Sequence, residues 1–341
     1  MKVLYYFFMV LLFMVSCSDA TENKDISTEF SELSERLNPT QVFEINPEKD
    51  TTIIGTKGTR VFIPAKSLVS DSGELGSPSV NVTLKEFYTF SEMILNGLST
   101  TSNGELLKTS GMIKIEASSR GKMLDLKKGS SIKIQFKNTA SAPFMRTYLG
   151  QRDSTGMNWQ LDEDNIDDTI KYNQQIEWII GLDYGADTVL SGTATYGVVG
   201  NDTLELFRTE WEMDSAGFIR EPLFYEIHST KLNWINCDHF LGSKDLIAVK
   251  ANKHSKVKTL NYLVFHDLHA IMSSWETMGK DAVFINIPRN SKVSAIGIAK
   301  EGSNYYLAAK KLILKEGNQR IKLKYKKSSL EKIVSKLEEL E

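Results

Sequence analysis

Most of the chain alternates short hydrophobic segments with turn-forming residues, and this pattern predicts β-strands. In residues 80–86 the apolar Val80, Val82 and Leu84 alternate with polar side chains, as in a strand with one buried and one solvent-facing side. Similar segments recur at residues 51–54, 60–63, 112–117, 131–136, 245–251, 260–265, 282–287, 293–299, 305–314 and 319–325. Further strand candidates are residues 176–180, 188–190 and 203–207. Gly, Asn and Asp turns separate them, which predicts a mainly β protein of antiparallel β-sandwich domains.

Two segments have the period of amphipathic helices instead. Near the N-terminus, one stripe of a short helix consists of Ile26, Phe30, Leu33 and Leu37, and Asn38-Pro39 would end it. At the C-terminus, residues 329–340 place on one face Leu330, Ile333, Val334, Leu337 and Leu340. We expect the first helix to dock on the body and the short C-terminal helix to pack on a sheet.

The first 16 residues have the layout of a signal peptide. Lys2 precedes an unbroken apolar run over residues 3–15, which is shorter than the roughly 20 residues that a membrane-spanning helix needs. The sequence Met14-Val-Ser-Cys17 resembles the lipobox at which bacterial lipoprotein signals are cut, with Met14 in place of the commoner Leu. This resemblance implies that Cys17 becomes the first residue of the mature protein and is lipidated through its thiol.

A lipid on Cys17 would fix the protein to the cell envelope. Two or more acyl chains are enough for stable anchoring, whereas a single chain is marginal. Ser18 follows the cysteine where Asp would oppose outer-membrane sorting, so we expect an outer-membrane lipoprotein whose body lies on the periplasmic or the surface side. The polar residues 17–46 would then form a tether that carries the short helix.

Composition narrows the classes of partner. The chain has 341 residues, a formal net charge of −2 and only two cysteines. Without an excess of positive charge, nucleic-acid binding is not expected. Once Cys17 is acylated, Cys237 has no disulfide partner. The basic stretch 322–327 alternates charged and apolar residues, which is typical of an edge strand protected by lysines.

Four segments carry a resemblance to a group of Bacteroidota lipoproteins. They are residues 55–65 (GTKGTRVFIPA), 80–86 (VNVTLKE), 106–112 (LLKTSGM) and 234–238 (WINCD). The strand-Ile-Pro-Ala opening in the first segment is similar to a ZU5-type β-sandwich. The resemblance implies an architecture and no activity. Some ZU5-type domains cleave themselves at a His-Phe-Ser site, and the sequence contains no such tripeptide.

These patterns divide the chain into five expected segments. They are a lipoprotein signal peptide (1–16), a polar tether with a short helix (17–46), a ZU5-like β-sandwich domain (47–140), a mixed β middle region (141–230) and a C-terminal β-domain with the terminal helix (231–341).

The densest group of reactive side chains is Asn236-Cys237-Asp238-His239. A thiol beside an imidazole has the chemistry of a nucleophile and its base. Neighbouring residues of a strand point to opposite faces, however, so adjacency in the sequence does not make such a pair. The alternative is a structural Cys237 buried beside Trp234, with Asp238 in a turn.

Two further segments contain potential metal ligands. His266 and His269 lie within one turn of chain, but a zinc site needs three or four ligands, and no HExxH motif or cysteine pair supplies the others. The alternative is a loop with solvated histidines. The acidic residues 162–168 lack the glycine and the distal Glu of a calcium-binding EF-hand loop, which favours a solvated loop. We therefore assign no catalytic residue, metal or cofactor.

The expected function is that of a lipid-anchored protein that binds or scaffolds an envelope protein or glycan. One alternative is a lipid-anchored hydrolase that uses Cys237 and His239. Another is a carbohydrate-binding module, which would require solvent-facing tryptophans, although core packing explains tryptophans equally well. The candidates are Trp159, Trp178, Trp211 and Trp275.

Overall fold

The computed structural model describes residues 26–70, 79–137, 145–152, 156–165, 191–196, 207–212, 224–254, 257–274, 276–278 and 281–341. Several predictions fall outside these residues: the signal peptide, Cys17, the strand candidates at 176–180 and 188–190, most of the candidate at 203–207, and residues 166–168 of the acidic loop.

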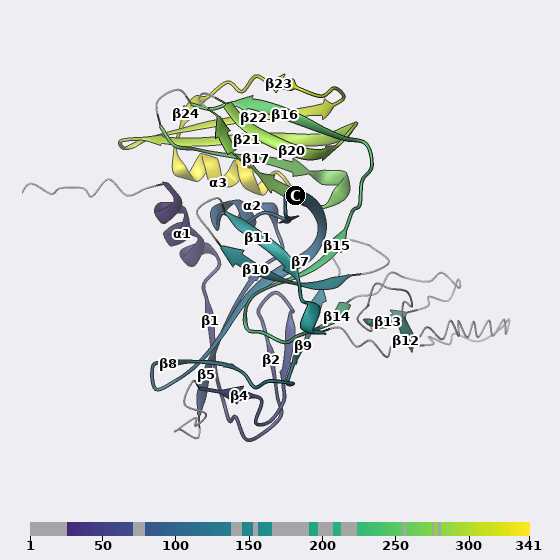
Figure 1. The fold of residues 1–341 in the computed structure, drawn as a ribbon. Helices are drawn as coiled ribbons and strands as arrows, with labels where there is room; N and C mark the ends of the chain where they lie inside the picture. The colour runs from purple at the N-terminus through teal and green to yellow at the C-terminus, as the bar shows by residue number, and fades with distance from the viewer. Residues whose placement is uncertain are drawn as a thin grey trace, which may run out of the picture.

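Two antiparallel sheets form a first β-sandwich, at the lower end of Figure 1. The larger sheet has the strand order β1-β5-β7-β15-β10-β11, with β4, β6 and β8 joined beside this path. Its strands are β1 (Gln41–Ile45), β4 (Leu68–Val69), β5 (Val80–Phe87), β6 (Thr101–Ser102), β7 (Glu105–Ser119), β8 (Lys122–Leu126), β10 (Arg146–Arg152), β11 (Met157–Leu161) and β15 (Asn233–Phe240). The smaller sheet consists of β14 (Phe224–Ser229), β9 (Ile132–Lys137), β3 (Arg60–Ile63) and β2 (Thr51–Ile54). Leu84, Ile134 and Ile235 are among the residues buried between the two sheets.

A second β-sandwich occupies the upper end of Figure 1. One sheet consists of β19 (Glu276–Met278), β20 (Asp281–Pro288), β16 (Leu246–Asn252) and β23 (Gln319–Ile321). The other consists of β18 (Ala270–Ser273), β17 (Thr259–Phe265), β21 (Ser291–Glu301), β22 (Asn304–Leu314) and β24 (Lys326–Ser328). Val249, Phe265 and Phe284 lie in the core between these sheets.

Three helices lie between the two sandwiches (Figure 1). They are α1 (Ile26–Leu37), α2 (Phe90–Leu95) and α3 (Leu330–Glu338). A third core cluster joins Phe30 of α1, Leu337 of α3, Phe87 of the first sandwich and Ile296 of the second. The molecule is therefore layered as sheet, sheet, helices, sheet, sheet. Among the described residues, β12 (Ser191–Tyr196) and β13 (Phe207–Glu212) form a separate two-stranded sheet. The short 3-10 helices are η1 (Glu163–Asn165) and η2 (His266–Leu268).

The prediction of a mainly β protein with antiparallel sandwiches and a short C-terminal helix is confirmed. Strands β2 and β3 have the predicted bounds, and α1 covers the predicted docking helix. The predicted stripe of α1 is wrong at its end, because Leu37 is 55% exposed while Ser34 is buried. The Ser34 hydroxyl accepts a hydrogen bond from Asn96 Nδ2 at 2.6 Å, so a polar contact takes the place of an apolar one.

The predicted strand over residues 319–325 is wrong in its second half, where the chain crosses between two sheets. Strand β23 ends at Ile321, and β24 begins at Lys326 in the other sheet of the same sandwich. Between them, Leu323 donates to Asn252 Oδ1 at 2.7 Å and accepts from Asn252 Nδ2 at 3.0 Å, so a side-chain amide replaces a strand partner. The edge strand β24 carries exposed lysines, as expected for a protected sheet edge.

Strand β15 is an internal strand of the larger sheet, although it is distant in sequence from both of its neighbours. It pairs with β7 on one side and β10 on the other. The larger sheet thus takes strands from all four segments predicted to follow the signal peptide. Strand β1, which lies within the predicted tether, was not expected.

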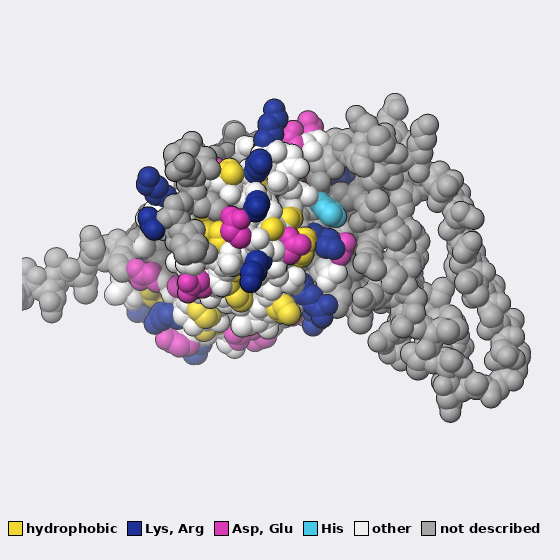
Figure 2. Space-filling view, turned by 90° about the horizontal axis from the view of Figure 1, so that it is seen from below, with side chains coloured by type: hydrophobic (Ala, Val, Ile, Leu, Met, Phe, Trp, Pro, Cys, Tyr) yellow, Lys and Arg dark blue, Asp and Glu magenta, His cyan; other side chains and the backbone are white. Residues whose placement is uncertain are grey.

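The surface at the lower end of Figure 1 mixes charged and hydrophobic side chains. Figure 2 shows this end, where lysine and arginine side chains are interspersed with acidic and hydrophobic ones. Such a face differs from the continuous basic patch that is typical of nucleic-acid-binding proteins. Within the part of the chain that the structure describes, none of the helices is long and apolar enough to cross a membrane.

Candidate functional site

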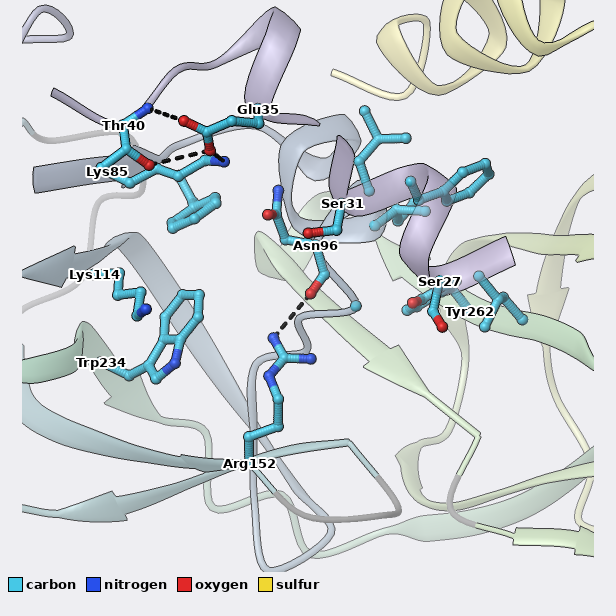
Figure 3. Close-up of a pocket in the computed structure, with 16 residues that line it drawn as sticks. Ser27, Ser31, Glu35, Thr40, Lys85, Asn96, Lys114, Arg152, Trp234 and Tyr262 are labelled. Atoms are coloured by element: carbon cyan, nitrogen blue, oxygen red, sulfur yellow. Dashed lines mark hydrogen bonds and ion pairs between the residues drawn. The ribbon is translucent and has the colours of Figure 1, made fainter. Parts of the chain in front are cut away.

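A cleft of about 420 Å³ opens between the two sandwiches. Helix α1 forms one wall, the outer face of the larger sheet forms the floor, and residues of β17 and the turn after α2 complete the lining (Figure 3). A volume of this size is within the range of small-molecule sites, which occur preferentially at interfaces between folded units. The cleft is therefore the candidate functional site.

A row of side chains crosses the floor of the cleft. Lys85 of β5 lies directly opposite Lys114 of β7, and Lys114 lies opposite Trp234 of β15. These positions point away from the core of the first sandwich, because Leu84 and Ile235 beside them point into it. The face that the alternation of β5 predicted to be wet thus becomes covered at Lys85, whose side chain is only 9% exposed.

Both lysines of the floor have carboxylate partners. Lys85 Nζ lies 2.8 Å from Glu35 Oε2 of α1, and Lys114 Nζ lies 2.9 Å from Glu116 Oε1 on its own strand. Desolvation acts to raise the pKa of Glu35, but hydrogen bonds from Lys85 and Thr40 outweigh it and lower the pKa. These pairs remove the repulsion that two lysines opposite each other in a sheet would otherwise cause.

Arg152 is the cation of the cleft without a carboxylate partner among the described residues. Its Nη2 donates to the Asn96 carbonyl oxygen at 2.9 Å, and its guanidinium carbon lies 5.5 Å from the centre of the Trp234 ring. Burial lowers the pKa of Arg152, yet a guanidinium stays protonated at neutral pH. Burial also raises the pKa of the neighbouring Tyr262 to about 12, so this phenol is neutral and leaves the charge uncompensated.

The Trp234 indole links the cations to the apolar wall. Its ring centre lies 5.5 Å from that of Phe87, and Lys114 Nζ lies 5.9 Å from it, at a distance typical of cation–π contacts. Figure 3 shows Lys114 and Trp234 side by side, with Arg152 extending from its strand toward Asn96. The cleft therefore combines an aromatic surface with positive charge.

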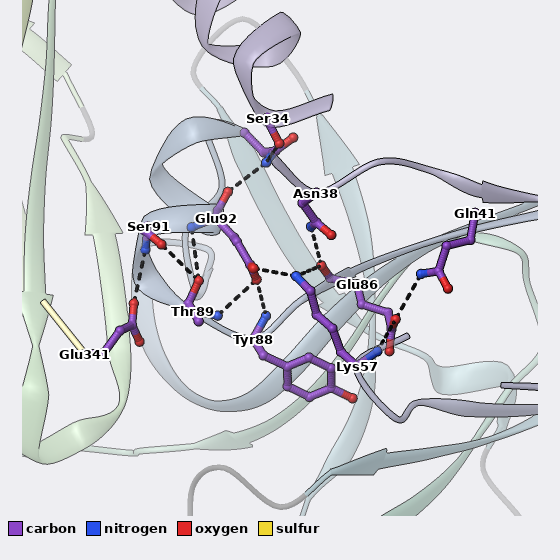
Figure 4. Close-up of polar contacts among 11 residues, drawn as sticks. Ser34, Asn38, Gln41, Lys57, Glu86, Tyr88, Thr89, Ser91, Glu92 and Glu341 are labelled. Atoms are coloured by element: carbon purple, nitrogen blue, oxygen red, sulfur yellow. Dashed lines mark hydrogen bonds and ion pairs between the residues drawn. The ribbon is translucent and has the colours of Figure 1, made fainter. Parts of the chain in front are cut away.

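A polar network beside the cleft holds β5 and α2 in place (Figure 4). The buried Glu86 carboxylate accepts from the backbone N–H groups of Lys57 and Thr59, each at 3.0 Å, in the turn between β2 and β3. Lys57 forms an ion pair with Glu92, which completes a capping box with Thr89 at the start of α2. The turn at residues 55–58 thus fixes β5, which carries Lys85, and α2, which ends next to Asn96.

The structure separates the Cys237 thiol from the imidazoles of His266 and His269. Cys237 is fully buried in the core of the first sandwich, so the expectation of a buried thiol is confirmed. His266 and His269 contact Phe90, which belongs to the core between the sandwiches. His239 follows on β15, opposite Lys108. The arrangement does not provide a shared cleft for a nucleophile and base.

His266 in η2 and His269 directly after it both have hydrogen-bond partners in neighbouring strands. His266 Nε2 lies 2.8 Å from Ser294 Oγ, and His269 Nδ1 lies 2.7 Å from the Thr109 carbonyl oxygen. Burial lowers the pKa of both imidazoles, which favours their neutral form. The alternative of solvated histidines is therefore wrong for His269, which is half-buried. No group of three or more potential metal-ligating side chains occurs among the described residues.

The prediction of a solvated acidic loop is wrong at its first residue, Asp162. Asp162 is 4% exposed, and its carboxylate accepts from the backbone N–H of Thr230 at 3.0 Å and from its hydroxyl at 2.9 Å. This side chain joins the end of β11 to the turn after β14. Asp164, in η1, is exposed as predicted.

Trp159 is not one of the solvent-facing tryptophans that a carbohydrate-binding module would require. Trp159 is fully buried and donates its indole N–H to the Ser99 carbonyl oxygen at 2.5 Å. Trp178, Trp275 and the side chain of Trp211 lie outside the described residues. Trp234 was not among these candidates. Of the tryptophans that the structure describes, it is the one that lines the cleft.

The cleft was not predicted from the sequence. The available signal was in β5, where the strand period places Lys85 and Phe87 on one face. Only the strand register shows that Lys114 and Trp234 continue this row.

Comparisons with protein-family models, curated proteins and solved structures find no match to the chain.

Proposed function

We propose that the protein is a lipid-anchored cell-envelope protein, attached through Cys17, whose body binds an anionic envelope component in the cleft. The lipobox-like residues 14–17 and the resemblance to Bacteroidota lipoproteins support localisation to the cell envelope. The observation that carries the binding role is Arg152, a cation that lines a cleft and has no carboxylate partner among the described residues. Together these features fit a protein that binds a ligand at the outer membrane.

The position of α1 suits this combination. Ser27 and Ser31 of this helix line the cleft, and Ile26 follows Cys17 by nine residues. A chain of that length spans at most about 32 Å, at ~3.6 Å for each residue. A lipid on Cys17 would therefore keep the cleft near the membrane surface.

The anchor is tested by metabolic labelling with palmitate. Cys17→Ala should abolish labelling and leave an uncleaved or mis-sorted precursor, because the thiol is the acceptor of the lipid. Cys237→Ala is the matched control and should be labelled like the wild type, since its thiol is fully buried. Labelling of the Cys17→Ala chain would refute the anchor.

The binding role is tested by cross-linking the full chain in cells and extracting it with detergent. We expect a specific envelope component to be captured by the wild type and lost with Arg152→Gln. Arg320→Gln is the matched control, because Arg320 forms an exposed ion pair with Asp281 in the second sandwich. Equal capture by the Arg152→Gln chain would exclude the cleft as the binding site.

A further inference from the structure

The groups in the cleft distinguish between kinds of anion. Lys85 and Lys114 are each paired with a carboxylate, so Arg152 is left as the group to receive a ligand's charge. A guanidinium has five N–H donors, and among the described residues only the Asn96 carbonyl oxygen accepts from one of them. Its planar fork suits a carboxylate or a phosphate, to which it can donate two parallel hydrogen bonds.

Uncharged polar groups lie on the same side of the cleft. The Ser31 hydroxyl and the Asn96 side-chain carbonyl have no hydrogen-bond partner among the described residues, although both line the cleft. Together they offer a donor and acceptors. A ligand that carries hydroxyl groups would satisfy both.

The remaining lining is apolar and aromatic. Trp234 of the floor and Leu260 of β17 are half-buried and offer apolar surface to the cleft, whereas Phe87 and Phe30 are fully buried. Aromatic side chains of this kind pack against the C–H face of a ring while their neighbours hydrogen-bond to its edge. A purely polar anion would gain nothing from this surface.

We propose that the cleft binds a saccharide that carries a carboxylate, such as a uronic acid unit of an envelope glycan. The carboxylate binds the Arg152 fork, the sugar hydroxyls bind Ser31 and Asn96, and the apolar face of the ring packs on Trp234. The cleft volume of about 420 Å³ limits the ligand to a short saccharide segment. This inference rests on the proposed function and names its ligand.

Calorimetric titration of the detergent-extracted full chain tests the inference with three probes: a digalacturonate, a neutral disaccharide of the same linkage, and inorganic phosphate. We expect saturable binding of the digalacturonate, at least about tenfold weaker binding of the neutral disaccharide, and no competition by phosphate at equal concentration.

Two variants connect this binding to the cleft. Arg152→Gln should weaken digalacturonate binding about tenfold or more, and Ser31→Ala should weaken it several-fold, because each removes one predicted contact. Arg320→Gln should leave the affinity unchanged. A circular dichroism spectrum and melting temperature like those of the wild type establish that each variant is folded.

Several results would overturn the inference. Equal binding of the neutral disaccharide would exclude recognition of the carboxylate, and effective competition by phosphate would indicate a general anion site. Unchanged affinity in both variants would place the saccharide elsewhere. If no saccharide binds while cellular capture still depends on Arg152, the ligand class is wrong and the proposed function stands. If capture is also independent of Arg152, both fail.

Discussion

At the scale of single residues, Asp238 is the buried carboxyl group with the least support. Its side chain is fully buried beside a β-bulge between Cys237 and Asp238. Oδ2 accepts from Asn236 Nδ2 at 2.5 Å, while Oδ1 has no hydrogen-bond partner among the described residues. Desolvation raises the pKa of Asp238 well above its usual value. The folded protein thus favours the protonated acid.

This shift predicts a pH-dependent stability. The pKa of Asp238 is higher in the folded than in the unfolded chain, so its contribution is fully present below the unfolded pKa and is lost as pH rises toward the folded value. Asp238→Asn removes the ionisation and should stabilise the protein at pH 7 by about 1.4 kcal/mol for each unit of the difference in pKa.

Urea denaturation of the wild type and Asp238→Asn at several pH values from 4 to 8 measures this effect. We expect the two midpoints to converge at the acid end and to separate as pH rises. Parallel pH profiles would show that Asp238 is ionised in the folded state.

At the scale of elements, local pattern was sufficient where a strand or helix buries one face. The period-two alternation located β5, and the period of 3.6 residues located α1 and α3. It failed where contacts between distant segments decide the structure. Asn252 replaces a strand partner at Leu323, and this requires knowing that the two segments are adjacent.

The cleft was unpredictable for the same reason. Lys85, Lys114, Arg152 and Trp234 come from four strands, and only the sheet register and the position of α1 bring them together. A single sequence gives the face of each strand and not the neighbour of that strand. The proposed anchor, by contrast, rests on a local pattern, because residues 14–17 are contiguous.

The turn between β2 and β3 gives a prediction at this scale. A Cβ at Gly55 would overlap the Glu86 carboxyl group, which is held by hydrogen bonds from three sides. Gly55→Ala should therefore destabilise the protein by about 3 kcal/mol or more, through overpacking and loss of these bonds.

Gly58 lies in the same turn and serves as the control. Its φ is +101°, but a Cβ there meets no atom within 4 Å, so Gly58→Ala should cost only about 1–2 kcal/mol of backbone strain. Chemical denaturation of both variants makes the comparison. A smaller loss for Gly55→Ala than for Gly58→Ala would contradict the role given to Glu86.

At the scale of the whole molecule, the helix layer makes one folding unit of two sandwiches. Ile333 and Leu337 of α3 are fully buried in the core between them. Glu29 of α1 accepts from Lys300 Nζ and from the Tyr305 hydroxyl, each at 2.5 Å, which ties this helix to the second sandwich. We expect both sandwiches to unfold in a single transition.

Leu337→Ala tests this coupling. The variant should lower the stability of both sandwiches together by about 2–5 kcal/mol, because it opens a cavity in the core that they share. Labelling of Cys237 reports on the first sandwich, and hydrogen exchange in β17 reports on the second. Glu338→Ala, on the exposed side of the same helix, is the control. Loss of protection in one sandwich alone would show that they are independent.

The insertion of β15 has a consequence for biogenesis. Roughly a hundred residues separate β7 from the strand that must pair with it, and at synthesis rates of ~5–20 residues per second this delays pairing by about 5–20 s. During that time the edges of β7 and β10 are open to pairing with other chains. Synthesis of this protein therefore requires chaperones that hold the emerging polypeptide until β15 is available.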